Sequence, residues 1–224
     1  MDSLDLARMQ MATEGRKLLA KAIVLAEEAR ERINQIAGLR CLSARQVESW
    51  GDFRLDVTKL TISVKGLGLT GYVASALLNT DFGIQVEMAD LFNVLVIVSI
   101  GDRRDDLDRL VSGLEQLAHR PLDGEERPRD IPTVPPVQEA RLIYSPREAY
   151  FAPHTFVPLA RAAGRVSADI ITIYPPGIPI LVPGEEISRT AVDYLQLLGA
   201  RGARIDGVLD QPDEAGPQVR VVAD

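Results

Sequence analysis

The first segment of the chain shows a helical pattern of apolar positions. Apolar residues recur at intervals typical of one helix face, at Leu4, Met11, Leu18, Ala22, Leu25, Ala29, Ile33 and Ile36. We therefore predict a helix from about residue 2 to residue 37, with Gly38 at the C′ position that follows its end. Helices of this length also occur in coiled coils, but Gly15 and several alanines would weaken a coiled-coil seam.

Residues 55–118 predict a mixed unit of strands and helices. In order, the pattern indicates a β-branched strand, a short apolar helix, two more strands and an amphipathic helix, over residues 55–64, 72–80, 84–88, 93–100 and 102–118. Only residues 89–92 separate the two later strands, whereas a parallel crossover needs about a dozen residues. These strands should therefore form an antiparallel hairpin, and the unit should have the order β-α-β-β-α.

The remaining residues predict a second, smaller unit. Residues 121–136 are rich in proline and charge and predict a linker between domains at 1–120 and 137–224. A capping box with Pro146 inside it indicates a helix that starts after Ser145. Ser188 should cap another helix that stops at Gly202, followed by short strands at 203–210 and 218–224. The expected fold class is α+β, ending in a small α/β domain.

The composition is that of a folded protein, since 46% of the residues are hydrophobic and 25% are charged, near the globular averages. No apolar run reaches the roughly 18 residues that a membrane span needs, and the N-terminus carries acid where a signal peptide carries basic charge. We therefore expect a cytoplasmic protein with no membrane partner. The net charge of −7 and the lack of a basic stripe make nucleic acid an unexpected partner.

Cysteine and histidine are scarce in this chain. The chain has one cysteine, Cys41, and two histidines, His119 and His154, too few for a zinc site of Cys and His ligands. The hydrolase motif G-x-S-x-G is absent. We therefore expect neither a metal site nor a catalytic triad.

Three glycines match a nucleotide-binding pattern. Gly66, Gly68 and Gly71 have G-x-G-x-x-G spacing between a predicted strand and a predicted helix, and Glu87 follows at the distance expected of a ribose-binding acid. The predicted hairpin argues against this hypothesis, because a dinucleotide-binding fold needs a parallel crossover there. The alternative is a flexible connection from strand to helix.

Lys59 could in principle form a Schiff base with a carbonyl substrate or pyridoxal phosphate. Such a lysine needs an acid for the pyridine nitrogen and a phosphate cradle nearby, and the sequence around it shows neither. The alternative is a strand lysine that faces solvent or forms a salt bridge.

Three carboxylates are candidates for binding a cation or a basic substrate. Glu87 and Asp90 flank the predicted hairpin turn and could act together on a cation, although a solvated turn is the simpler explanation. Glu185 precedes a helix, where the helix dipole favours negative charge whatever the function.

Residues 173–184 form a rigid apolar stretch with four prolines and two glycines. Proline fixes the backbone and glycine permits sharp turns, so this path should be extended with two turns. It could dock against another protein surface or form a local β-corner.

Three sequence blocks resemble the C-terminal domain of the Orn/Lys/Arg decarboxylase family, bacterial pyridoxal-phosphate enzymes of the aspartate-aminotransferase fold. The blocks are SPREAYFA, AGRVSAD and YPPGIPILVPGE, at residues 145–152, 163–169 and 174–185. They follow the order and spacing of the family, with Tyr150 where it often has phenylalanine and Asp169 where it often has glutamate. The long helix, residues 56–59 and the hairpin at 83–95 are similar to the family's aminotransferase-type small domain.

The resemblance implies the C-terminal portion of a decarboxylase that converts arginine, lysine or ornithine to an amine and CO2. The family's S-x-H-K lysine has no counterpart in this chain, so no catalytic or cofactor-binding residue is assigned to it. We expect the large domain that binds pyridoxal phosphate to be a missing partner, and the chain alone to be inactive. The resemblance also implies a homo-oligomer.

In such an enzyme a basic substrate side chain needs carboxylate partners, because an unpaired buried cation is costly. Glu87, Asp90 and Glu185 are the candidates for this substrate-binding role. The alternative function is a non-catalytic binding or assembly module derived from the same family.

Overall fold

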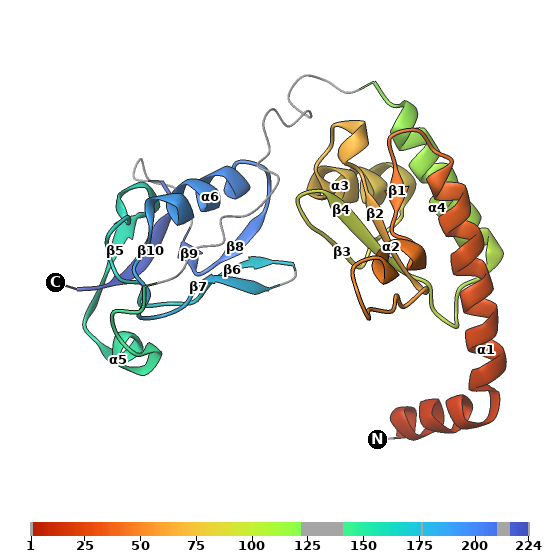
Figure 1. Ribbon diagram of the computed structural model, residues 1–224, viewed down its shortest axis with the longest axis horizontal. Coiled ribbons are helices and arrows are strands. Elements are labelled where there is room, and N and C mark those ends of the chain that lie inside the picture. The colour runs from red at the N-terminus through yellow and green to blue at the C-terminus, as the bar shows by residue number, and fades with distance from the viewer. Residues whose placement is uncertain (1, 122–140, 176, 210–215, 224) are drawn as a thin grey trace. The chain divides into compact units, whose positions relative to one another are not determined.

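The computed structural model describes residues 2–121, 141–175, 177–209 and 216–223. The chain divides into two compact units, Met1–Pro128 and Arg129–Asp224, and each unit is described here by itself (Figure 1). The linker expected over residues 121–136 lies outside the described residues except for Pro121.

The N-terminal unit is built on one antiparallel sheet. Its four strands have the order β1-β2-β4-β3, and all three pairings are antiparallel. In chain order its elements are α1 (Asp2–Asn34), β1 (Arg40–Cys41), α2 (Ala44–Glu48), β2 (Lys59–Ser63), η1 (Lys65–Leu67), α3 (Gly71–Phe82), β3 (Met88–Ala89), β4 (Asn93–Ile97) and α4 (Arg104–His119).

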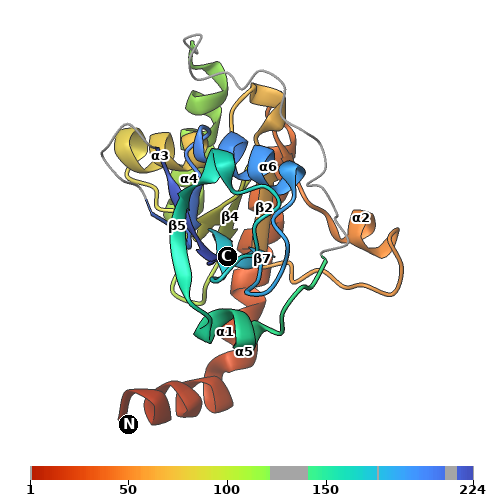
Figure 2. The same ribbon diagram turned by 90° about the vertical axis from the view of Figure 1, so that its left-hand side faces the viewer.

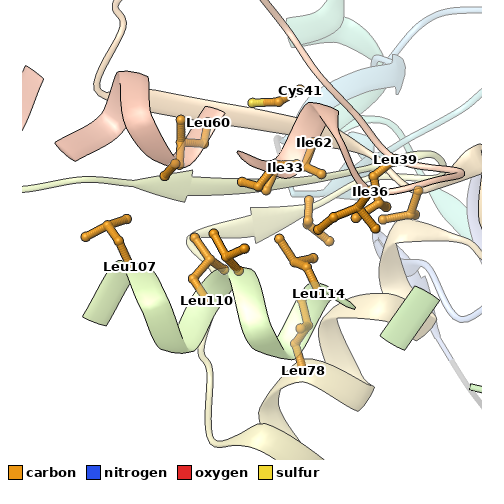
Figure 3. Close-up of a cluster of buried hydrophobic side chains, with 14 of the residues drawn as sticks. Ile33, Ile36, Leu39, Cys41, Leu60, Ile62, Leu78, Leu107, Leu110 and Leu114 are labelled. Carbon is orange, nitrogen blue, oxygen red and sulfur yellow. The ribbon is translucent and has the colours of Figure 1, made fainter. Parts of the chain in front are cut away.

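The core of this unit lies between the helices and the sheet. Figure 3 shows Leu107, Leu110 and Leu114 of α4 pointing toward Leu60 of β2 and Ile33 of α1. All five side chains are buried in one hydrophobic cluster. The amphipathic pattern that predicts α4 therefore also identifies the face that α4 buries.

The predicted order β-α-β-β-α is present as β2-α3-β3-β4-α4. The hairpin is confirmed, since Met88 pairs with Leu95 and Ala89 with Val94. The strand predicted over residues 84–88 is wrong for residues 84–87. The N–H of Ile84 donates to the carbonyl of Leu78 at 2.9 Å, which ties the start of this stretch to the end of α3. The sequence pattern did not indicate β1 or α2, because both are too short to show a period.

Only the second half of α1 belongs to the core. Residues 2–14 are all exposed, whereas Ala22, Leu25, Ala29 and Ile33 are buried. Figures 1 and 2 show that the helix bends and that its first turns point away from the sheet. Gly15, the glycine within this helix, belongs to a residue type that is often found at helix kinks.

A buried arginine attaches α1 to the loop that precedes β2. Arg30 is only 4% exposed, and its guanidinium donates to the carbonyls of Leu42 at 2.8 Å and Val57 at 2.9 Å. It also pairs with Glu27 at 3.1 Å. The buried cation is thus surrounded by acceptors that compensate for its lost hydration.

The C-terminal unit contains two antiparallel sheets of three strands each, with orders β5-β10-β9 and β7-β6-β8. Among its described residues, a cluster of buried side chains forms a core that includes Leu159, Ile171, Leu195 and Val219. In chain order its elements are α5 (Pro146–Phe151), β5 (His154–Pro158), η2 (Leu159–Arg161), β6 (Ile171–Tyr174), β7 (Ile178–Leu181), α6 (Arg189–Gly199), β8 (Arg204–Asp206), β9 (Val208–Leu209) and β10 (Gln218–Val222).

The helix starts of this unit are as predicted. Glu148 N donates to Ser145 Oγ at 3.3 Å and Ser145 N donates to the Glu148 carboxylate at 2.9 Å, which completes the capping box. Ser188 caps α6 through Ala191 N at 3.0 Å. The expected α/β arrangement differs from what is found, because the named strands pair antiparallel. This unit is therefore α+β as well.

The rigid apolar stretch over residues 173–184 folds back within its own unit. The stretch begins in β6 and includes β7, and these two strands pair antiparallel with Ile173 opposite Ile178. The Tyr174–Pro175 peptide bond is cis. This agrees with the local β-corner interpretation. Ile178 is 64% exposed, and docking of this stretch on another protein stays a prediction.

Candidate functional site

Glu87 has a solvent-exposed carboxylate beside the β3–β4 hairpin. It directly precedes β3, and its backbone N–H donates to the carbonyl of Leu95 at 2.9 Å, which holds the residue beside β4. Its side chain is exposed. Among the described residues, no hydrogen bond or ion pair involves this carboxylate, so it can accept a cationic ligand without breaking a contact of the fold.

Asp90 lies on the same hairpin but serves the turn. Its Oδ1 accepts the backbone N–H groups of Phe92 at 2.7 Å and Asn93 at 2.8 Å, and the Asn93 side chain donates to both carboxylate oxygens. Short acidic side chains often close turns in this way. The solvated-turn interpretation of Asp90 therefore accounts for its contacts, and Glu87 is the stronger substrate candidate.

Glu185 lies in the other unit, and its carboxylate closes the turn after β7. Its Oε2 accepts the backbone N–H of Val182 at 2.9 Å, and its carbonyl accepts the N–H of Ser167 at 2.9 Å. Gly184 is tightly packed in the same turn, since a Cβ there would lie 2.1 Å from the Tyr144 carbonyl oxygen. These contacts give Glu185 a structural role.

The three glycines of the nucleotide-like pattern are explained by backbone packing. A Cβ on Gly71 would lie 2.1 Å from the carbonyl oxygen of Asn93, and one on Gly66 would lie 2.4 Å from that of Gly38. Gly68 has a left-handed φ of 73°, which favours glycine. The connection between β2 and α3 is thus structural, as the alternative proposed, but it is tightly packed rather than flexible.

The lysines do not form a site for pyridoxal phosphate. Lys59 Nζ lies 3.9 Å from Asp56, as the salt-bridge interpretation expects, and Lys65 Nζ lies 5.1 Å from the centroid of the Phe92 ring. Lys21 donates to the carbonyl of Asp102 at 3.0 Å, and Lys17 is exposed on α1. Because the cofactor needs a protected amine with a phosphate cradle and an acid beside it, the described residues do not fit this group.

Three cavities of the described residues contain none of the candidate carboxylates and no lysine. The one in the C-terminal unit has a volume of about 350 Å³ and is lined mainly by apolar residues, including Leu195, Ile205 and Val208. No group of three or more His, Cys, Asp or Glu in the described ranges is placed to hold a metal ion. In the same ranges no helix combines the length and apolar character of a transmembrane span.

Sequence reasoning missed a polar cluster around Arg220 in β10. Its guanidinium lies 3.2 Å from His154 Nδ1, 3.6 Å from Asp169 Oδ2 and 5.4 Å from the Tyr150 ring centroid. These partners lie 51 to 70 residues away in sequence, so no local pattern indicates them. The cluster joins α5, β5 and β10.

His119 lies at the end of α4 and contacts that helix. Its Nδ1 is 2.7 Å from the carbonyl oxygen of Glu115, the kind of interaction that cationic and donor side chains make at helix C-termini. The contacts of the two histidines within the described residues are therefore structural.

Two ionisable groups of the N-terminal unit have a pKa that is shifted by their surroundings. Burial raises the pKa of the Cys41 thiol to about 11, against the opposing effect of the Arg30 charge, so this cysteine is not a nucleophile at neutral pH. A hydrogen bond from the Thr58 hydroxyl lowers the pKa of Asp56. Neither Cys41 nor Asp56 is close in sequence to a candidate carboxylate, and none of the contacts described above joins them to one.

Comparison with known proteins relates this chain to amino acid decarboxylases. Residues 139–211 match the family described as Orn/Lys/Arg decarboxylase, C-terminal domain. The arginine decarboxylase of Bacillus subtilis is 40% identical over 86% of this chain, and that of Halalkalibacterium halodurans is 41% identical over 93%. The chain covers 39% and 42% of these two relatives, about two fifths of their length.

Solved structures show a related fold. The constitutive lysine decarboxylase of Escherichia coli has a TM-score of 0.69 at 20% identity, with 93% of this chain and 41% of that one covered. Lysine decarboxylase A of Pseudomonas aeruginosa has a TM-score of 0.71 at 20% identity, with 99% and 42% covered. At such low identity these likenesses concern the fold alone.

Proposed function

Residues 139–211 belong to the family of Orn/Lys/Arg decarboxylase C-terminal domains, and from this premise we propose that the chain is the C-terminal portion of a decarboxylase of basic amino acids. The observation that carries the proposal is the 41% identity to an arginine decarboxylase over 93% of this chain. The N-terminal unit would then be an aminotransferase-type small domain. The substrate would be arginine, lysine or ornithine, and the products an amine and CO2.

The cofactor of such an enzyme would be held outside this chain. Pyridoxal phosphate accepts the electrons that decarboxylation releases, but the described lysines form no site for it. We therefore propose that a large domain supplies the cofactor, that the chain alone is inactive, and that the assembly is a cytoplasmic homo-oligomer.

The contribution proposed for this chain is recognition of the basic side chain by Glu87. A guanidinium or ammonium group binds a carboxylate best where both are partly removed from water. Glu87 is suitable because its carboxylate has no partner among the described residues and its backbone is held by Leu95. Asp90 would support it by keeping the hairpin turn in place.

A hybrid enzyme tests this function directly. The whole chain replaces the part of the Bacillus subtilis arginine decarboxylase to which it aligns, and CO2 release is measured from carboxyl-labelled arginine, lysine and ornithine. We expect release that depends on added pyridoxal phosphate, and the preferred substrate identifies the amino acid. A folded hybrid that releases no CO2 would contradict the proposal and favour the non-catalytic binding module.

Glu87→Gln in the hybrid tests the recognition role. We expect KM for the preferred substrate to rise at least tenfold, about 1.4 kcal/mol, while the unfolding midpoint stays unchanged because the side chain is exposed. Glu115→Gln, an exposed glutamate of α4, is the matched control and should leave KM unchanged. An unaltered KM in the Glu87 variant would show that this residue does not bind substrate.

A further inference from the structure

A cavity of the C-terminal unit lies between the end of α6 and the strands β8 and β9. Its volume is about 350 Å³, and its walls include Leu159 and Leu195, both of which belong to the hydrophobic core of this unit. These leucines are only 2% and 0% exposed, so the cavity extends to the core. Ile205 and Val208 form its wall on the side of the strands. We call this space the α6 cavity.

The α6 cavity exists because small residues face it. Gly199, Ala200 and Ala203 line it at and just after the end of α6. Among the described residues, a Cβ on Gly199 would meet only the Cδ1 atom of Ile205, at an ordinary contact distance of 3.6 Å. A Cβ on Gly207, in contrast, would lie 2.2 Å from a backbone carbonyl oxygen. Close packing therefore requires glycine at position 207 but not at position 199, and the space beside α6 is free.

Backbone hydrogen bonds hold the walls of the α6 cavity in place. The N–H of Leu159 donates to the carbonyl of Pro217 at 2.8 Å, and Ile205 pairs with Ile173 between β8 and β6. Walls that are already ordered lose little further freedom when a ligand binds, which favours affinity. Small-molecule sites are usually preformed in this way and lined mainly by apolar side chains.

The lining of the α6 cavity indicates the charge of its ligand. Its described lining residues carry no charged side chain, and Gln196 is the polar one among them. The Gln196 amide makes no hydrogen bond to another described residue. Two cavities of the N-terminal unit, in contrast, include charged side chains such as Asp106 and Arg32. Because a charge is costly to bury without a partner, the α6 cavity favours a neutral molecule.

The volume of the α6 cavity indicates the size of the ligand. An engineered cavity of about 150 Å³ lined by apolar side chains binds benzene, and the α6 cavity is roughly twice as large. We propose that the α6 cavity binds a neutral, mainly apolar small molecule of roughly ten to fourteen non-hydrogen atoms, with one polar group that hydrogen-bonds to Gln196. The site does not depend on the proposed function, because its described walls all belong to the C-terminal unit.

Equilibrium dialysis of the full chain at pH 7 tests the ligand class. The probes 2-naphthamide and 2-naphthoate have nearly the same size and shape, but only the second carries a charge. We expect 2-naphthamide to bind saturably, with a dissociation constant at least tenfold lower than that of 2-naphthoate. Equal affinities, or no saturable binding of 2-naphthamide by the folded chain, would overturn the inference.

Two alanines allow a matched test of the binding position. Ala203→Leu fills the α6 cavity from a half-buried position just before β8. Ala223→Leu adds the same side chain at a half-buried alanine just after β10 that does not line the cavity. The first change should weaken binding of 2-naphthamide at least tenfold, and the second less than twofold. Undiminished binding by Ala203→Leu would place the ligand elsewhere.

Gln196→Leu tests the polar contact through two further probes, 2-naphthol and naphthalene, which differ by one hydroxyl group. The ratio of their dissociation constants is measured in the natural chain and in the variant. Loss of a hydrogen bond to the amide should shift this ratio at least threefold in favour of naphthalene. An unchanged ratio would show that Gln196 does not contact the ligand.

Hydrogen exchange locates the ligand without any substitution, and therefore decides the question even where a variant does not fold. Saturating 2-naphthamide should slow exchange of the backbone amides of residues 195–205 at least threefold, because a ligand that binds only the folded state makes opening rarer. Residues 84–97 of the N-terminal unit provide the internal reference and should not change. Slower exchange at residues 84–97 in place of residues 195–205 would contradict binding in the α6 cavity.

Discussion

Arg30 is a charged residue at a position where the helix faces the core. Its guanidinium satisfies backbone carbonyls on both sides of the loop that precedes β2. That loop carries the exposed aromatic residues Trp50 and Phe53. A single side chain thereby determines how a loop of irregular structure is attached to the longest helix.

We expect Arg30→Met to lower the free energy of unfolding of the N-terminal unit by about 2–4 kcal/mol, because it leaves three partly buried carbonyls and Glu27 without their donor. Urea unfolding followed by circular dichroism measures this change, and the fluorescence of Trp50 reports on the loop. Arg32→Met is the control in the same helix. Arg32 pairs with Asp108 while both are nearly half exposed, so its loss should cost under about 0.5 kcal/mol. Equal effects of the two substitutions would contradict this account of Arg30.

Cys41 makes the stability of the N-terminal unit sensitive to alkaline pH. The pKa of the thiol is raised to about 11 by burial, whereas an unfolded thiol titrates near pH 8.5. A raised pKa stabilises the fold fully below the unfolded value, and this contribution is lost as the pH rises toward 11.

We therefore expect the unfolding free energy of the natural chain, minus that of Cys41→Ala, to fall by roughly 3 kcal/mol between pH 8 and pH 11. Urea unfolding of both proteins across this pH range measures the difference. Between pH 6 and pH 8 the difference should be constant, because the thiol is neutral in both states. A difference that stays constant up to pH 11 would argue against a buried neutral thiol.

The turn from β2 into α3 shows how closely two elements can approach. Gly71 begins α3 directly against the carbonyl of Asn93, at the hairpin that carries Glu87 and Asp90. Two of the glycines that match a nucleotide-binding pattern, Gly66 and Gly71, thus have a packing role. Gly68 instead adopts a left-handed φ of 73°, which favours glycine.

Gly71→Ala should lower the free energy of unfolding by at least about 2 kcal/mol, because its Cβ would overlap backbone that cannot move alone. Thermal unfolding followed by circular dichroism measures the effect. Gly101→Ala is the control, since a Cβ there would meet only the Ser99 hydroxyl at 3.5 Å, and its effect should stay within about 0.5 kcal/mol. A small effect at Gly71 would show that α3 can shift away from the hairpin.

Across the whole chain, the two hydrophobic clusters share no residue. One is formed by residues of the N-terminal unit and the other by residues 157–221. Each unit therefore has a core of its own, as expected of a domain.

Leu114→Ala should destabilise the N-terminal unit by about 2–5 kcal/mol, the usual cost of truncating a fully buried leucine. Hydrogen exchange of the backbone amides of the N-terminal unit should accelerate in this variant, while exchange of the C-terminal unit should not change. Leu195→Ala should have the reverse effect, since Leu195 is equally buried in the other core. Acceleration in both units by either substitution would show that they unfold together.

The sequence alone indicates the long helix, α4, the hairpin and the caps at Ser145 and Ser188. These features depend on periodicity, loop length and capping chemistry, which act between residues close together in the chain. The family resemblance was also readable, because three blocks keep their residues and spacing. The sequence does not predict the short elements β1 and α2 or the true extent of β3, because two to five residues are too few to show a period.

The tertiary structure was needed to separate the candidate residues by role. The carboxylates of Asp90 and Glu185 accept backbone N–H groups in turns. Gly71 packs against the hairpin and His154 contacts Arg220. The carboxylate of Glu87 has no such contact among the described residues. Sequence shows only that these residues exist, because the contacts that occupy Gly71 and His154 come from residues 22 and 66 positions away. Contacts of that separation form only when the whole unit packs, and local patterns therefore cannot reveal them.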